Sequence, residues 1–267
     1  MGTDDGGPNG VTYRINLNAD IGEGFGAYDI GNDADLMTVI RSASVACGFH
    51  AGDANTMHSL TLLAKQNNVS LGVHPGFNDL WGFGRRKIDM DPHDLELMVA
   101  YQIGALQAMA RYAGLPVTHL KPHGALNNMA AVREDYAEAI GRAIQTVDDR
   151  IIYVALAGSE MEKAARKLGL RLAREGFADR HYEDDGNLSP RSIPGTVFKD
   201  PDKALKQCLS MVKDRCLTSR QGNRVDVAVE TICVHGDEPT AVALARHVRQ
   251  GLEAADCRIV TLPEMFN

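Results

Sequence analysis

Short apolar runs rich in β-branched residues alternate with longer segments of helical spacing from residue 11 onward. Short apolar runs bounded by turn residues are typical of buried strands, and an apolar repeat every three to four positions is typical of helices. We predict strands at 13–17, 43–47, 70–73, 117–120, 151–155, 171–173, 228–234 and, more weakly marked, 258–262. We predict helices at 33–40, 56–66, 92–113, 136–144, 160–167, 201–212 and 239–254.

Several predicted helices carry a start signal. Asp91 and Asp200 each precede a proline, which fits an N-cap carboxylate followed by proline at the first helical position. Asp53 and Asp237 precede two further helical segments and fit the same role. Strands that alternate with helices pair in parallel through right-handed crossovers, so the pattern predicts an α/β protein.

Polar and titratable side chains follow nearly every predicted strand. They are Asn18, Asp20 and Glu23 after the first, His50 and Asp53 after the second, His74 after the third, Lys121 and His123 after the fourth, Asp179 and Arg180 after the sixth, and His235 and Asp237 after the seventh. An open sheet collects its ligands near one switch point, whereas a barrel gathers them from a whole ring of strand ends. We therefore predict a (β/α) barrel of seven or eight mostly parallel strands.

No linker of biased composition and no repeat interrupts this alternation, so residues 11–267 are predicted to form a single barrel domain. Residues 1–10 are rich in Gly and Asp and have no apolar core, which predicts a flexible N-terminal tail and no secretory signal. No apolar stretch approaches the roughly 20 residues that cross a bilayer.

Composition narrows the range of partners and compartments. The net charge is −7, and no dense run of Lys and Arg offers the basic face that nucleic acid or an anionic membrane requires. The five cysteines are scattered without a CxxC pair, which predicts buried thiols in a reducing compartment. We therefore expect a cytoplasmic protein that binds neither nucleic acid nor membranes.

Four of the nine histidines, His50, His74, His123 and His235, fall at predicted strand ends. Imidazole titrates near neutral pH, so the group is a candidate for proton transfer. Any one of these histidines taken alone could instead be a structural residue held by hydrogen bonds. Their common position at strand ends favours the functional reading for the group.

The acidic residues and the lysine each allow two readings. Asp20 and Glu23 could act as base and partner or bind a metal ion, or they could fix a turn and a loop. Asp53 and Asp237 could orient the preceding histidine, or could simply cap the next helix, which is worth about 1 kcal/mol. Lys121 ends an apolar strand, where it needs an anion such as Asp20, a substrate carboxylate or phosphate; a plain structural ion pair is the alternative.

Two arginines close the glycine-rich run GFGRR. Arg85 and Arg86 could bind a carboxylate or phosphate, because guanidinium groups match these anions and glycines let the backbone approach a ligand; a solvated surface loop is the alternative. The candidate substrate-binding residues are Asn18, Glu23, Arg85, Arg86, Asp179, Arg180 and Asp237.

Six sequence runs resemble one family, in order along the chain. They are NLNADIGEGFG (16–26), ACGFHAGD (46–53), VHPGFNDLWGFGRR (73–86), LKPHGAL (120–126), EGFADRHYEDDGNLSPRS (175–192) and CVHGD (233–237). These runs are similar to those of the LamB/YcsF family, and the resemblance extends from about residue 13 to the end of the chain. It implies a barrel of the glycoside hydrolase/deacetylase type.

The resemblance also implies an activity. It implies the A-type subunit of an ATP-dependent 5-oxoprolinase, a hydrolase that works with subunits B and C to open the cyclic amide of 5-oxoproline to glutamate; a homo-oligomer is also compatible with the sequence. The candidate catalytic residues are Asp20, His50, His74, Lys121, His123 and His235. The alternatives are a stand-alone metal-dependent deacetylase or hydrolase on the same barrel, and a non-catalytic lactam-binding subunit.

The sequence gives little support for a nucleotide or metal site on this chain alone. It has no GxxxxGK[ST] run, and the run GEGFG misses the GxGxxG spacing, so ATP with its Mg²⁺ is expected to bind mainly on or with the partner subunits. Barrels related to this family often hold a metal with an Asp-His-His set, for which Asp20, His50 and His123 are the candidates. Because ATP coupling removes the need for a Lewis acid on the amide, we expect no resident metal.

Overall fold

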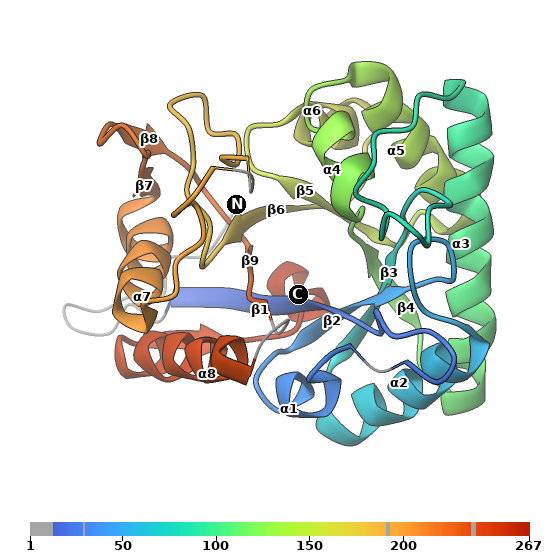
Figure 1. The fold of residues 1–267 in the computed structure, drawn as a ribbon, viewed down its shortest axis with the longest axis horizontal. Coiled ribbons are helices and arrows are strands. Elements are labelled where there is room, and N and C mark those ends of the chain that lie inside the picture. Colours follow the sequence, from blue (N-terminus) through green and yellow to red (C-terminus); the bar gives the residue numbers. More distant parts are fainter. Residues whose placement is uncertain (1–12, 29, 191–192, 236–238) are drawn as a thin grey trace.

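The computed structural model describes residues 13–28, 30–190, 193–235 and 239–267. Within these ranges seven parallel strands close into a barrel, because each pairs with the next and the last pairs back to the first. In order around the ring they are β1 (Tyr13–Ile21), β2 (Ser42–Ala46), β3 (Ser70–His74), β4 (Val117–Leu120), β5 (Ile152–Leu156), β6 (Leu172–Phe177) and β9 (Thr231–Cys233). Figure 1 shows this ring with the helices arranged outside it. The predicted (β/α) barrel is confirmed.

The eighth predicted strand exists but lies outside the closed ring. β10 (Cys257–Ile259) pairs with the first three residues of β1, whereas β9 pairs with Asn16–Asn18 of the same strand. β1 is therefore long enough to pair with two strands in succession. A short antiparallel hairpin of β7 (Cys216–Thr218) and β8 (Arg224–Asp226) was not predicted, since each strand is only three residues long.

The helices follow the predicted alternation closely. They are α1 (Asp33–Met37), α2 (Ala54–Asn67), α3 (Pro92–Ala113), α4 (Gly124–Ala130), α5 (Glu134–Asp148), α6 (Glu160–Lys167), α7 (Pro201–Leu209) and α8 (Pro239–Ala254). A π-helical turn at Ser210–Asp214 extends α7, and a 3₁₀ turn at Pro263–Phe266 ends the chain. α4 was not predicted, because its seven residues are too few to display a helical period. Among the described residues, no helix combines the length and apolarity needed to cross a membrane.

The helix-start signals are confirmed where the structure describes them. The carboxylates of Asp53, Asp91 and Asp200 each accept hydrogen bonds from backbone N–H groups in the first turn of the helix that follows. Asp53 also accepts a hydrogen bond from the backbone N–H of Gly26, so it ties the loop after β1 to the start of α2. Asp237 lies outside the described residues.

Two strands are longer than predicted, and the extra residues reach the barrel interior. β1 continues to Ile21 and β6 continues to Phe177, so Asn18, Asp20 and Glu175 lie within strands rather than after them. Alternation along a strand sends every second side chain inward. Side chains of β1 and β6 and of Lys121, which follows β4, therefore meet inside the ring.

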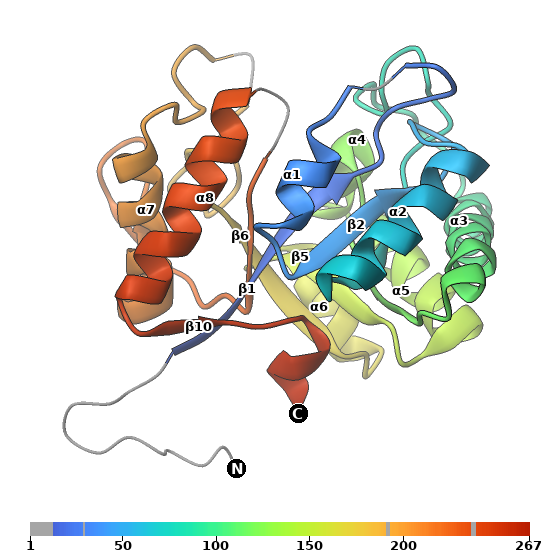
Figure 2. The same cartoon turned by 90° about the horizontal axis from the view of Figure 1, so that it is seen from below.

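Figure 2 shows several long connecting loops at one end of the barrel and the C-terminus at the other end. The loops follow the carboxyl ends of the strands, and these are the loops that carry the predicted site residues. The five cysteines are buried, free thiols, as the sequence predicts.

Candidate active site

A cavity of about 720 Å³ opens at the carboxyl ends of the barrel strands. Its lining includes Asp20, Glu23, Lys121, His123 and His235, which the strand-end pattern singled out. The remaining wall carries three cationic side chains, from Arg85, Lys87 and Arg180, together with the segment 187–190. Because the predicted residues come from different strands and share one cavity, the structure brings most of the predicted site together.

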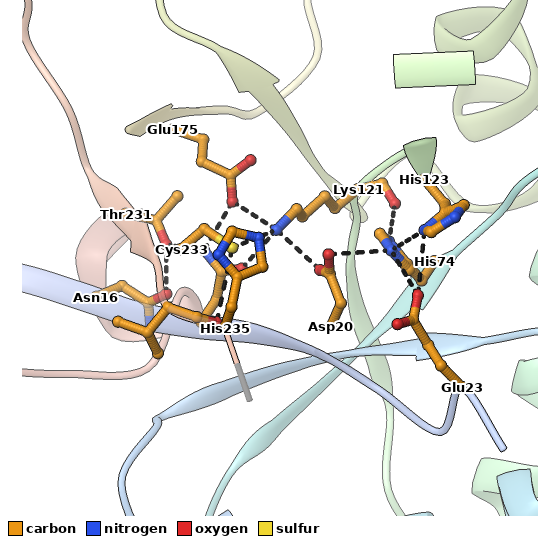
Figure 3. Close-up of polar contacts among 12 residues, drawn as sticks. Asn16, Asp20, Glu23, His74, Lys121, His123, Glu175, Thr231, Cys233 and His235 are labelled. Carbon is orange, nitrogen blue, oxygen red and sulfur yellow. Dashed lines mark hydrogen bonds and ion pairs between the residues drawn. The ribbon is translucent and has the colours of Figure 1, made fainter. Parts of the chain in front are cut away.

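Lys121 occupies the floor of this cavity, inside the barrel. Its ammonium lies 2.9 Å from the carboxylate of Asp20 on β1 and 2.9 Å from that of Glu175 on β6. It also donates to the side-chain carbonyl of Asn18 at 3.0 Å and to the sulfur of Cys233 at 3.1 Å. Figure 3 shows the ammonium between the two carboxylates. Four strands thus hold one buried cation.

The charges on the cavity floor stabilise one another. Burial alone would lower the pKa of Lys121, but Asp20, Cys233 and Glu175 outweigh it and hold this pKa well above its ordinary value. Burial would raise the pKa of Asp20, but His74 and Lys121 hold it well below its usual range. Burial raises the pKa of Glu175, although Lys121 opposes the change. Lys121 is therefore a permanent cation, and Asp20 carries the compensating negative charge.

Asn18 organises this floor through both ends of its side-chain amide. Its Nδ2 group donates to Glu175 at 2.9 Å and to the Thr231 hydroxyl at 2.7 Å, while its Oδ1 atom accepts from Lys121. The Thr231 hydroxyl donates in turn to Asn16 at 2.7 Å. Buried polar groups linked in this way have their hydrogen bonds satisfied, which fixes the geometry of the lysine.

A second cluster lies beside the first, at the ends of β1 to β4. It consists of Glu23, His50, His74 and His123, which we call the histidine cluster. The Glu23 carboxylate lies 3.1 Å from His123 and 3.3 Å from His50, and the rings of His74 and His123 approach to 3.0 Å. The Asp20 carboxylate joins the two clusters, because its second oxygen lies 3.3 Å from Nε2 of His74 (Figure 3).

Burial and charge act in opposite directions within the histidine cluster. Burial lowers the pKa of His50 to about 3, although its hydrogen bond to Glu23 opposes the change. Burial would also lower the pKa of His74, but the nearby Asp20 carboxylate outweighs it and raises this pKa. Burial would raise the pKa of Glu23, but the neighbouring imidazoles of His123 and His50 hold it far below its usual range. The pKa values of the neighbouring residues His50 and His74 are thus shifted in opposite directions.

Glycines bring the loop after β3 onto the histidine cluster. Gly84 has a φ of +62°, and a Cβ placed there would lie 2.7 Å from Cβ of His50 and 2.8 Å from Cδ2 of His123. A Cβ at Gly76 would lie 2.6 Å from Nδ1 of His50. Residues with side chains would push the loop away, so these glycines allow the loop to cover the two stacked imidazole rings.

His235 lies on the opposite side of the cavity floor and is paired with an acid. Its Nδ1 atom lies 2.8 Å from the carboxylate of Asp179, and its ring stacks on Phe177. Because a carboxylate at neutral pH only accepts hydrogen bonds, Nδ1 carries the proton and Nε2 is the basic nitrogen of the neutral ring. Arg180, next in sequence to Asp179, donates to the backbone carbonyl of Ser189 at 2.6 Å and lines the cavity.

The two neighbouring arginines are placed differently. Arg85 lines the cavity, and its guanidinium lies 5.0 Å from the centre of the Phe83 ring. Arg86 forms an ion pair with the buried carboxylate of Asp79, which also accepts from the backbone N–H of Gly82. The structure therefore does not bring Arg86 into the cavity lining with the other predicted site residues. Arg86 instead holds the glycine-rich loop in place through its ion pair with Asp79.

Sequence reasoning missed Glu175, Cys233 and Lys87 as site residues. Glu175 and Cys233 contact Lys121 directly, and Lys87 adds a cation to the wall. Glu175 was missed because the sixth strand was predicted to stop at residue 173. The continued alternation of Ala173, Glu175 and Phe177 could have found it, since side chains two positions apart point to the same face.

The barrel, the buried lysine and the histidine cluster at the strand ends define a (β/α)-barrel protein with an enzyme-type polar active site. A solved structure, the lactam utilization protein from Thermus thermophilus, has the same fold: the TM-score is 0.89 at 40% sequence identity, over 93% of this chain and 100% of the other. Residues 15–267 match the LamB/YcsF family, and the chain belongs to this family.

Curated relatives are similar over nearly their whole length. A protein of Rhodopseudomonas palustris (strain ATCC BAA-98 / CGA009), named as the A-type subunit of 5-oxoprolinase, is 49% identical over 91% of this chain and 96% of its own. A protein of Bacillus subtilis (strain 168) with the same name is 44% identical over 94% of this chain and 98% of its own. The resemblance read from the six sequence runs is thereby confirmed.

Proposed function

We propose that this chain is the A-type subunit of an ATP-dependent 5-oxoprolinase, which cleaves 5-oxoproline to L-glutamate. The observation that carries the proposal is the near-complete match to relatives that bear this name. The cavity supports it, because its wall carries the cations Arg85, Lys87 and Arg180 for a substrate carboxylate or a phosphate. Its floor carries the ionised carboxylate of Asp20, which lines the cavity and contacts His74.

Opening 5-oxoproline is difficult because an unstrained amide is a poor electrophile. Transfer of a phosphoryl group from ATP to the amide oxygen converts that oxygen into a leaving group. Water then adds to the same carbon, and the C–N bond breaks as the ring nitrogen takes a proton to become the amine of glutamate, which leaves an acyl phosphate. A second water hydrolyses the acyl phosphate to the side-chain carboxylate of glutamate and free phosphate. The protein must therefore bind anions, remove a proton from water and deliver a proton to nitrogen.

The cavity residues match these tasks. Asp179 accepts the Nδ1 proton of His235, which makes Nε2 of His235 the basic nitrogen for deprotonating water. Lys121 keeps Asp20 ionised, and the Asp20 carboxylate links the lysine to His74. His50 and His123, stacked beside Glu23, complete the polar side of the cavity.

Subunits B and C are the proposed partners, and ATP with its Mg²⁺ is proposed to bind mainly on them or at their contact with this chain. The lack of a phosphate-binding glycine loop in this sequence supports that division. The buried free thiols support the cytoplasm as the site of action.

Reconstitution tests the proposal. The chain is mixed with purified subunits B and C from the same organism, ATP and 5-oxoproline, and glutamate and ADP are measured. We expect product only when all three chains are present. Product from this chain without ATP, or no product although all three chains are folded, would refute it.

Matched variants separate catalysis from simple lactam binding. Asp20→Asn and Lys121→Met are expected to lower kcat by about 100-fold or more, because each removes a charge that is fixed in the cavity floor and can stabilise charge in the transition state. The controls are Asp89→Asn and Lys163→Met, whose side chains are largely exposed. If both cavity variants turn over at the control rate, the chain only binds the lactam and the catalytic assignment is wrong.

A further inference from the structure

The histidine cluster contains four potential ligand atoms that lie close together. They are Nε2 of His50, Nε2 of His74, Nδ1 of His123 and Oε1 of Glu23, and all lie within 4.8 Å of one another. The separations of neighbouring atoms run from 3.0 to 3.9 Å. Each residue comes from a different strand end, so the barrel itself holds the arrangement.

Hydrogen bonds to backbone carbonyls fix the protons on two of these rings. Nδ1 of His74 lies 2.7 Å from the carbonyl oxygen of Lys121, and Nε2 of His123 lies 2.8 Å from that of Phe83. A carbonyl oxygen can only accept, so each of these nitrogens carries a hydrogen. In the neutral rings the lone pairs are therefore on Nε2 of His74 and Nδ1 of His123.

Those two lone pairs face each other at 3.0 Å, and the Glu23 carboxylate lies 3.1 Å from one of them. The Asp20 carboxylate is a further acceptor, 3.3 Å from Nε2 of His74. Acceptors this close repel one another unless a cation lies among them. One added proton makes one ring a donor but leaves the other acceptors to compete for it, whereas a metal ion bonds to several lone pairs at once.

The geometry suits a zinc-type ion. Zinc bonds to nitrogen and carboxylate oxygen at about 2.0–2.2 Å in a tetrahedron, which places neighbouring ligand atoms about 3.3–3.6 Å apart. Histidines that bind metals also tend to donate their second ring N–H to a backbone carbonyl, as His74 and His123 do here. The geometry was not available from the sequence, whose candidate set of Asp20, His50 and His123 shares only two members with the cluster.

We propose that Glu23, His50, His74 and His123 bind one divalent transition-metal ion of the zinc class. Asp20 lies between the proposed metal site and the Lys121 ammonium. One of its oxygens contacts Lys121, and the other contacts His74 of the metal site. The two cations can therefore occupy the same cavity without direct contact. The inference rests on ligand geometry and holds whichever reaction the protein catalyses.

Metal binding can be measured without any activity assay. The purified chain is stripped with a chelator, dialysed and titrated with Zn²⁺ alone, and bound metal is measured by mass spectrometry and calorimetry. Co²⁺ is then added as a spectroscopic probe, since four-coordinate Co²⁺ absorbs visible light far more strongly than the hydrated ion. We expect one ion per chain and a four-coordinate Co²⁺ spectrum.

Variants locate the ion. His74→Ala, His123→Ala and the nearly isosteric Glu23→Gln are each expected to weaken Zn²⁺ binding by about 100-fold or more, since loss of an outer partner alone costs about 10–100-fold. His93→Ala, at an exposed histidine outside the cluster, is the control for unspecific binding of Zn²⁺ to surface histidines. Circular dichroism shows that each variant is folded.

Two results would overturn the inference. The first is a folded wild-type chain that retains no Zn²⁺ and gives only the spectrum of hydrated Co²⁺, which would mean that the cluster is held by a shared proton. The second is binding that survives in Glu23→Gln and His74→Ala but is lost in His235→Ala. That result would place the ion at the neighbouring group of Asp20, Cys233 and His235.

Discussion

Lys121 and Glu175 form an ion pair at 2.9 Å inside the barrel, and neither side chain is more than 3% exposed. The pair joins β4 to β6, strands that are not neighbours in the ring, so it spans the barrel interior. Asp20 supplies the second carboxylate to the same ammonium from β1. The cavity floor therefore depends on one cation, Lys121, which pairs with carboxylates from two other strands.

Removal of this cation should destabilise the fold strongly. Lys121→Met leaves Asp20 and Glu175 buried without their counter-ion, and loss of one member of a buried pair costs about 3–5 kcal/mol. Adding Glu175→Gln to Lys121→Met removes one uncompensated charge and should restore part of the loss. Denaturant unfolding of both single variants and the double variant measures the coupling; strictly additive costs would show that the pair does not interact energetically.

The hydrogen bond between Asp179 and His235 should matter for turnover more than for binding. Asp179→Asn replaces the carboxylate that fixes the Nδ1 proton of His235, so the ring loses its orientation and its preferred tautomer. In the reconstituted complex we expect kcat to fall by about 100-fold or more, with a shifted pH–rate profile and a KM that changes much less. A variant whose KM rises while kcat stays constant would make Asp179 a binding residue instead.

Gly84 should tolerate alanine poorly for two separable reasons. Its positive φ disfavours any side chain, by about 1–2 kcal/mol, and its new Cβ would also press on His50 and His123. Gly114 has a similar φ of +69° but open space around its Cβ position. Gly84→Ala should therefore lower both stability and the activity of the complex, whereas Gly114→Ala should lower stability alone. Equal effects on activity would show that the contact with the histidines is unimportant.

Neighbouring Arg85 and Arg86 should give opposite phenotypes. Arg85→Ala removes a cation from the cavity wall and is expected to raise KM for 5-oxoproline or ATP at nearly unchanged stability. Arg86→Ala breaks the ion pair with Asp79 and should lower the stability of the chain. Steady-state kinetics and thermal unfolding on both variants check this, and a reversed pattern would contradict the placement of the two guanidinium groups.

The same ion pair predicts a pH dependence. The hydrogen bond from Arg86 lowers the pKa of Asp79, so the pair stabilises the fold fully above the unfolded-state pKa of about 3.9. The stabilisation is lost as pH falls through the lower pKa of the folded state. Asp79→Asn should therefore be less stable than wild type at pH 7, and the gap should shrink below about pH 4. A gap that stays constant down to about pH 2 would exclude this linkage.

Local sequence patterns predicted most of the secondary structure. The helices at 92–113, 160–167 and 239–254 are confirmed at both ends. Prolines mark the start of the first and the last of these helices. Strand ends were less certain. β1 and β6 run four residues beyond their predicted ends, since pairing with neighbouring strands continues the extended backbone past the apolar run.

The sequence by itself determined the alternation of strands and helices, the position of reactive side chains near strand ends, and family membership, because these features are written in short local runs. The tertiary structure alone decided which side chains meet. It placed Glu175 opposite Lys121, turned Arg86 toward Asp79 and gathered Glu23 with three histidines. The reason is that barrel closure and strand register bring together residues that are far apart in the chain. Neither closure nor register can be predicted from the sequence of any single segment.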